Sequence, residues 1–196
     1  MFPALLLIPL IALFRVFLAW QPVGSFYTTF LPGACPLSAV ALCAGMFLPR
    51  RLALVVPLSI LLLSDVVIDL HYHENFFSAY LLGRYALLAL IGLGGMALRG
   101  RTGTGTVLGA TLAGSTLFYV ASNALAWLGS TAYAQTPAGL WQALTVGTPG
   151  FPPSYVFFRN GLVSDGLYSM VFVACVHLAS RPKNVLATTR ALADAR

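Results

Sequence analysis

The chain has 196 residues, of which 59% are hydrophobic and only 8% are charged. Because soluble domains carry roughly 25% charged residues, this composition excludes a soluble globular protein. The net charge of +6 comes from short basic clusters between apolar runs, and no basic face is interleaved with aromatics, so the sequence also argues against nucleic-acid binding.

Six apolar segments each approach the length of a transmembrane helix. In chain order they are residues 3–20, 36–48, 52–70, 77–98, 107–128 and 155–179. We interpret the first as a retained helix and not as a signal peptide, because it has no basic leader and Arg15 interrupts it. The second is short, so we expect it to extend through residues 31–35 or to cross a thinned part of the bilayer. The sequence therefore predicts one all-α transmembrane domain over residues 1–180, with about six spans.

The segment between the last two spans is too short and too rich in proline to cross the membrane. Its apolar stretch, residues 138–146, is expected to form an interfacial helix anchored by Trp141. Residues 181–196 are expected to form a cytoplasmic tail.

The positions of the basic residues predict the orientation. Arg50 and Arg51 follow the second span, Arg99 and Arg101 follow the fourth, and four more basic residues lie after position 180. The alternate loops contain no lysine or arginine. By the positive-inside rule both termini are cytoplasmic, which requires an even number of spans.

Several strongly polar residues remain inside the predicted spans or at their rims, mostly in the outer half of the bilayer. They are Arg15, Asp65, Asp69, Arg84, Asn123, Arg159, Asn160 and Asp165. An ionised side chain at a helix centre costs roughly 2.5–3.5 kcal/mol on insertion scales, so these groups need partners. The i,i+4 spacing of Asp65 and Asp69 places both carboxylates on one helix face, where a neighbouring arginine can reach them.

Two interpretations of these polar residues remain open. They can line an outward-facing pocket for a small polar solute, since intramembrane charges often mark substrate paths. Alternatively, they are internal ion pairs that fix how the helices pack.

Other patterns are weaker. His71, His73 and Glu74 could ligate a metal, but an interfacial loop explains them more simply, and the sequence shows no hydrolase or ATPase motif. We therefore expect no enzymatic activity, no metal and no cofactor. Ala41 and Gly45, one turn apart, allow close helix packing and are also candidates for docking a partner subunit.

The sequence resembles an uncharacterised family of small bacterial integral membrane proteins. The likeness is carried by Phe30-Leu-Pro, Pro36 through Phe47, Ser64-Asp65, Ser115 through Tyr119, Ser122-Asn123, Asn160 and Asp165. That family is in turn distantly similar to the substrate-binding S components of energy-coupling-factor vitamin transporters. The similarity implies six helices, an outward-facing pocket, and partnership with a transmembrane coupling subunit and ATPase subunits.

The S components dock their partner through small residues on the first helix, whereas the nearest match here, Ala41 and Gly45, falls on the second span. The function expected from the sequence is thus a solute-binding component of an uptake transporter in the bacterial cytoplasmic membrane. The alternative is a membrane scaffold or accessory subunit of a larger complex.

Overall fold

The computed structural model describes residues 2–22, 24–72 and 79–180, and within these ranges the chain forms helices and no strands. The helices are α1 (Phe2–Ala19), α2 (Phe26–Phe30), α3 (Leu37–Phe47), α4 (Val55–Tyr72), α5 (Ala79–Ala97), α6 (Thr104–Gly129), α7 (Pro137–Leu144) and α8 (Ser154–Ser180). The all-α prediction is confirmed. The predicted tail and the residues His73 and Glu74 lie outside the described ranges.

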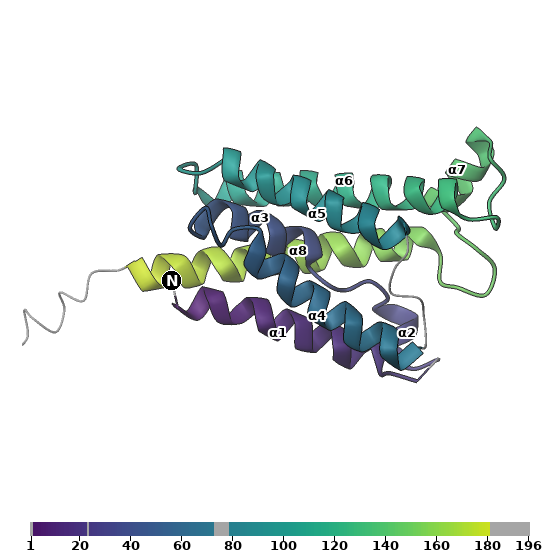
Figure 1. The fold of residues 1–196 in the computed structure, drawn as a ribbon, viewed down its shortest axis with the longest axis horizontal. Helices are drawn as coiled ribbons and strands as arrows, with labels where there is room; N and C mark the ends of the chain where they lie inside the picture. Colours follow the sequence, from purple (N-terminus) through teal and green to yellow (C-terminus); the bar gives the residue numbers. More distant parts are fainter. Residues whose placement is uncertain (1, 23, 73–78, 181–196) are drawn as a thin grey trace, which may run out of the picture.

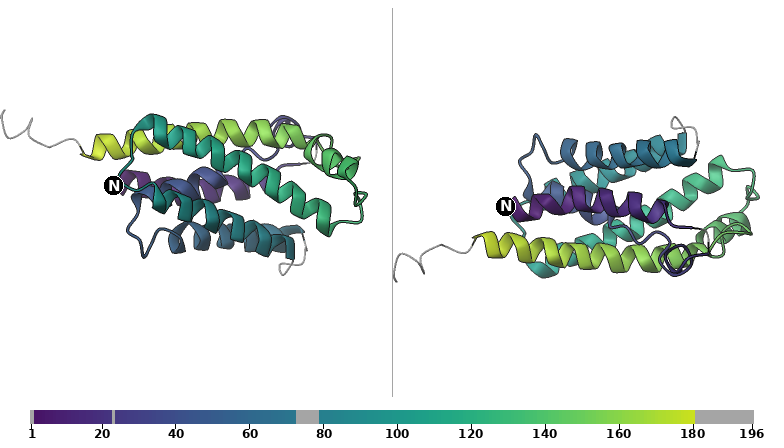
Figure 2. Two further views of the ribbon diagram at one scale, coloured as in Figure 1. Left: turned by 90° about the horizontal axis from the view of Figure 1, so that it is seen from above. Right: turned by 90° about the horizontal axis from the view of Figure 1, so that it is seen from below.

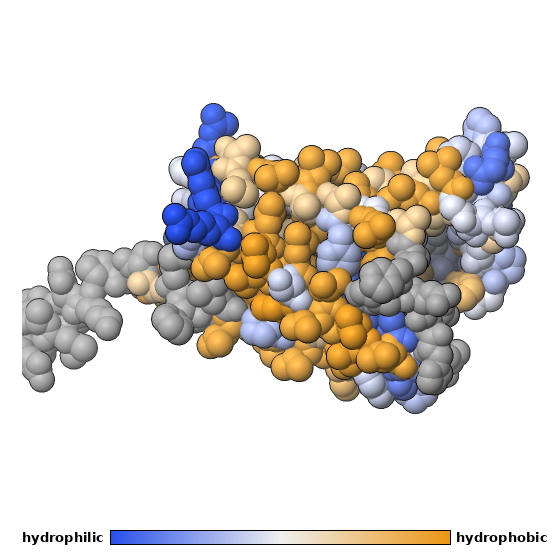
Figure 3. All heavy atoms as spheres, viewed as in Figure 1, coloured by the Kyte–Doolittle hydropathy of each residue, from blue (hydrophilic) through white to orange (hydrophobic). Residues whose placement is uncertain are grey.

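The long helices run side by side along one axis, as Figures 1 and 2 show. Helices α4, α5, α6 and α8 are long and apolar enough to cross a bilayer, so four of the predicted six spans meet that criterion. Hydrophobic side chains cover the middle of the face in Figure 3, and hydrophilic ones gather at its two ends. This distribution fits a membrane-embedded bundle, whose lipid-facing surface must be apolar.

The second predicted span, residues 36–48, matches helix α3 within one residue at each end but is not lengthened by the residues before it. Helix α3 has 11 residues, which is about 16 Å of helix against a hydrocarbon core of about 30 Å. It does not extend through residues 31–35, so the first of the two expected alternatives is wrong; the other, a thinned part of the bilayer, stays a prediction. Pro32 and Pro36 lack the amide hydrogen that a helix needs, and Gly33 adopts a positive φ of 69°. Residues 31–36 therefore stay non-helical, and α3 occupies only the half of the bundle nearer the start of α1 (Figure 1).

Helix α3 is nevertheless the centre of the core. Every residue from Ser38 to Met46 is buried, and the helix contacts α4, α5, α6 and α8. A short helix surrounded in this way needs no polar face, because none of its sides meets water.

Glycines bring α3 and α5 into backbone contact. A Cβ atom built on Gly45 would lie 2.1 Å from the carbonyl oxygen of Gly92, and one on Gly95 would lie 2.4 Å from that of Leu42. Ala41 is 1% exposed at the same contact. The small residues Ala41 and Gly45 thus pack α3 against α5 inside the protein, and they offer a partner subunit no exposed surface in this structure.

This packing predicts opposite effects at two adjacent glycines. We expect Gly95→Ala to destabilise the protein by about 1–3 kcal/mol, because the new methyl group would clash with the backbone of α3, which cannot move away as a flexible side chain could. Gly94→Ala is the matched control, since a Cβ there meets nothing within 4 Å and alanine favours helix by about 1 kcal/mol. Unfolding in a denaturing detergent measures both, and equal effects would contradict the close α3–α5 contact.

Arg99 caps the C-terminal end of α3. Its Nε donates to the carbonyl oxygen of Gly45 at 2.9 Å, and its Nη2 donates to that of Leu48. The last carbonyls of a helix are unpaired and carry partial negative charge, so a guanidinium stabilises them. Arg99 therefore has a structural role in addition to the topological one expected from its position.

Candidate functional site

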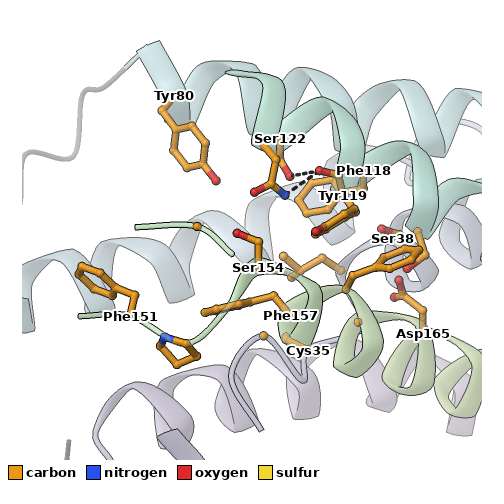
Figure 4. A pocket seen from close by; sticks show the side chains of 18 of the residues that line it. Cys35, Ser38, Tyr80, Phe118, Tyr119, Ser122, Phe151, Ser154, Phe157 and Asp165 are labelled. Carbon is orange, nitrogen blue, oxygen red and sulfur yellow. Dashed lines mark hydrogen bonds between the residues drawn. The ribbon is translucent and has the colours of Figure 1, made fainter. Parts of the chain in front are cut away.

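A cavity of about 440 Å³ lies beyond the N-terminus of α3, in the half of the bundle that this short helix leaves unfilled. Its walls come from α1, the start of α3, α5, α6, α8 and the two non-helical segments around residues 33–35 and 147–152. Figure 4 shows Ser38 and Asp165 at one end of it and Tyr80 and Phe151 at the other. The volume is within the usual range for small-molecule sites, about 300–1,000 Å³.

Asp165 forms the inner end of the cavity and is 2% exposed. Its Oδ1 accepts a hydrogen bond from the backbone N–H of Ala39 at 2.9 Å, and the carboxylate is also hydrogen-bonded to Ser38 and Ser115. The N-cap residue of α3, Pro36, makes no side-chain cap. Asp165 on α8 therefore caps α3 from another helix and places a negative charge at the positive end of its dipole.

Asn160 binds the end of α2 and the start of the non-helical segment 31–36. Its Nδ2 donates to the backbone carbonyls of Phe30 at 3.0 Å and Pro32 at 2.9 Å. Arg159 donates to the side-chain oxygen of Asn160 at 3.0 Å and, more weakly, to the Phe30 carbonyl at 3.4 Å. Neither residue lines the cavity. They satisfy carbonyls that the non-helical backbone would otherwise leave unpaired in an apolar medium.

Arg15 lines the cavity and also belongs to a buried ion cluster beside it. Its guanidinium donates to Asp65 Oδ1 at 2.5 Å and to Ser64 Oγ at 2.7 Å. Asp65 Oδ2 accepts from Arg84 at 2.6 Å and from the Tyr85 hydroxyl at 2.5 Å. One carboxylate thus joins two arginines and ties α1, α4 and α5 together.

Asp69 does not join this cluster. It is half-buried one turn beyond Asp65, and within the described ranges it has neither a hydrogen bond nor an ion pair. Both arginines reach the level of Asp65 instead. The i,i+4 spacing therefore predicted a shared face correctly but could not show which carboxylate the arginines meet.

The polar residues of α6 and the aromatic residues around them make up most of the remaining wall. Ser115, Tyr119, Ser122 and Asn123 recur at the spacing of one helix face, and Tyr119 stacks on Phe158 of α8 with ring centroids 4.5 Å apart. Asn123 donates to the Tyr119 backbone carbonyl at 2.8 Å. Sequence reasoning selected only Asn123 from this face, although the repeat of hydroxyl groups was a signal that could have found the others.

Helix α7 and its neighbours form the outer edge of the site. The structure confirms a short helix here, at Pro137–Leu144, with Thr136 capping its start through Gly139 at 3.2 Å. The Tyr119 hydroxyl donates to the carbonyl of Leu144, and Trp127 donates to that of Ala134 at 2.8 Å. These bonds anchor α7 to α6. They thereby position the connection that follows α7, which lines the cavity.

The eight predicted site residues therefore fall into distinct groups. Arg15, Asn123 and Asp165 line the cavity, while Asp65 and Arg84 lie behind Arg15 in its ion cluster. Asn160 and Arg159 hold the non-helical segment, and Asp69 stands apart.

Comparison with known proteins shows which family the chain belongs to. No curated protein and no solved structure matches the chain. A family model described as a family of unknown function, DUF6580, matches residues 1–188, almost the whole sequence. The chain therefore belongs to DUF6580.

Proposed function

We propose that this protein binds a small solute within the membrane, in the cavity beyond the N-terminus of α3. The supporting observation is the cavity itself: about 440 Å³, bounded by Arg15, Asn123 and Asp165, at the break of a discontinuous helix. Broken helices in membrane proteins place helix ends and free backbone groups at ligand sites near the middle of the bilayer.

The proposed topology follows from counting α3 together with the non-helical segment before it. The six residues 31–36 and the 11 residues of α3 would cross the bilayer jointly, which keeps an even number of crossings. Arg50, Arg51, Arg99 and Arg101 lie in the α3–α4 and α5–α6 connections, at the same end of the bundle as the start of α1. We place that end in the bacterial cytoplasm, so the cavity lies in the outer half of the membrane.

The proposed role is binding and not catalysis. The charged residues nearest the cavity, Arg15 and Asp165, are hydrogen-bonded to other parts of the chain and so hold the walls in place. Uptake of the solute would require partners, a transmembrane coupling subunit and ATPase subunits, as in the S-component systems. The docking surface for such a partner would have to lie elsewhere than at Ala41 and Gly45.

A specific observation favours the alternative, a scaffold or accessory subunit. Asp65, Asp165, Asn160 and Arg99 all satisfy groups of the same chain. Hydrogen bonds and ion pairs within the chain would be sufficient to explain why polar residues occur in the spans. The two proposals differ in whether the cavity takes a ligand.

Filling the cavity separates these proposals. A Cβ on Gly161, which lines the cavity, meets nothing within 4 Å, so Gly161→Leu should occupy the space without a clash. In a thermal-shift screen of purified protein against a broad panel of small solutes, we expect at least one solute to raise the melting temperature of the wild type and not of Gly161→Leu.

Gly109→Leu is the matched control, because Gly109 is exposed on α6, lies away from the cavity and also has free space around it. It should respond to solutes as the wild type does. Failure of every solute to stabilise the wild type would favour the scaffold.

A further inference from the structure

The cavity is electrically balanced by the protein itself. Arg15 and Asp165 are the charged residues among those that line it. Arg15 is paired with Asp65 at 2.5 Å, and Asp165 is held by the N-terminus of α3. Arg84 shares Asp65 with Arg15, so the charges of two arginines, Asp65 and Asp165 sum to zero at this side of the described structure. An ionised ligand would add a charge to this balanced set, and burying an unpaired charge in a low-dielectric site is costly.

The cavity walls are rich in aromatic rings. They include Tyr80, Phe118, Tyr119, Phe151, Phe157 and Phe158. Tyr119 and Phe158 already form a stacked pair with ring planes 24° apart. Figure 4 shows the rings of Phe118, Tyr119 and Phe157 on the sides of the cavity, with Phe151 nearer its mouth. Such walls favour a flat ring, which can stack or meet their edges.

Hydroxyl and amide groups are spread among these rings. Ser122 and Asn123 come from α6 and Ser154 from the start of α8, and Figure 4 shows Ser38 at the inner end of the cavity. Asn123 donates through its Nδ2 to the Tyr119 carbonyl, and its side-chain oxygen has no hydrogen-bond partner within the described ranges. Hydroxyl groups both donate and accept, so they match a ligand with amide or hydroxyl substituents.

We infer that the solute is uncharged and aromatic, a ring system with hydrogen-bonding substituents at its edge. The inference rests on the proposed binding function and narrows its ligand class. It follows from the pairing of both charged lining residues within the chain, the aromatic walls, and the neutral donors and acceptors between them.

A matched set of four probes tests this class. Indole-3-acetamide is neutral, indole-3-acetate is an anion, and tryptamine is a cation, all on the same ring. Myo-inositol is a neutral polyol without a ring of this kind. Binding to the full-length protein in lipid nanodiscs would be measured by titration calorimetry, with empty nanodiscs subtracted to remove partitioning into lipid.

We expect indole-3-acetamide to bind at least tenfold more tightly than either charged analogue and than myo-inositol, and we expect Gly161→Leu to abolish that binding while Gly109→Leu keeps it. Equal or tighter binding of a charged analogue or of myo-inositol would overturn the inference. So would the absence of binding by all four probes. The proposed function would survive either result if the broad solute panel still contains a compound whose effect Gly161→Leu removes, so the two failures are distinguishable.

Discussion

Asp65→Asn is expected to lower the free energy of unfolding by about 3–5 kcal/mol, the range observed when one partner of a buried ion pair is removed. Asp65 is 4% exposed and pairs with both Arg15 and Arg84. An amide leaves two guanidinium groups without a counter-charge inside the bundle. Reversible unfolding in mixed micelles, with helicity followed by circular dichroism, measures the loss.

Asp69→Asn is the control for this prediction. It makes the same chemical change one turn along the same helix, at a carboxylate with no ion pair in the described part of the chain. We expect a change within about 0.5 kcal/mol. Similar losses in the two variants would contradict the central role of Asp65.

The position of Asp65 also changes what its substitution says about function. The sequence places Asp65 among the residues that can line a pocket for a solute. In the structure it does not line the cavity and acts through Arg15. Loss of stability is therefore expected under both proposed functions, and the cavity-filling variant at Gly161 distinguishes them better.

Most of the helices were predictable because each is a long apolar run between polar or turn-forming residues. The interval 107–128 became Thr104–Gly129, and 155–179 became Ser154–Ser180. The interval 36–48 likewise became Leu37–Phe47. The expected extension through residues 31–35 failed because hydropathy measures side chains alone. Pro32 and Pro36 are apolar enough to pass as part of a span, yet they remove the amide donors on which a helix depends.

The site was only partly predictable because its key contacts are tertiary. The sequence indicated that Asp165 and Asn160 need partners inside the membrane. It could not show that those partners are backbone groups of a segment more than 120 residues away, namely the N–H of Ala39 and the carbonyls of Phe30 and Pro32. A partner that is a backbone group cannot be recognised from the residue types in a sequence. In contrast, two aspartates and an arginine directly suggest an ion pair.

The break before α3 connects the fold with the proposed function. A helix that stops halfway leaves space in the other half of the bundle, and this space is the cavity. It also leaves the N-terminus of α3 inside the bundle, without water to satisfy its amides. Asp165 meets this need with the charge that the helix dipole favours, and Arg99 does the same at the opposite end of α3. The same structural feature thus requires the buried charges and creates the pocket.

Asp165→Ala should therefore damage both stability and binding. The substitution removes the acceptor for the Ala39 amide and a hydrogen-bonding partner of Ser38 and Ser115. Each buried polar group left unsatisfied costs about 1–3 kcal/mol, so we expect a total loss of at least about 3 kcal/mol. Amide hydrogen exchange should accelerate at Ser38 and Ala39, because the first turn of α3 would fray.

Ser164→Ala is the neighbouring control on α8. The Ser164 hydroxyl bonds only within its own helix, to the carbonyl of Gly161 at 3.1 Å, so its loss should leave stability and exchange nearly unchanged.

Any solute found to bind the wild type should bind Asp165→Ala at least tenfold more weakly, since the frayed turn carries Leu37 and Ser38 of the cavity wall. If Asp165→Ala keeps both its stability and the slow exchange of Ala39, the inter-helix cap does not hold α3, and the cavity must be maintained by packing alone.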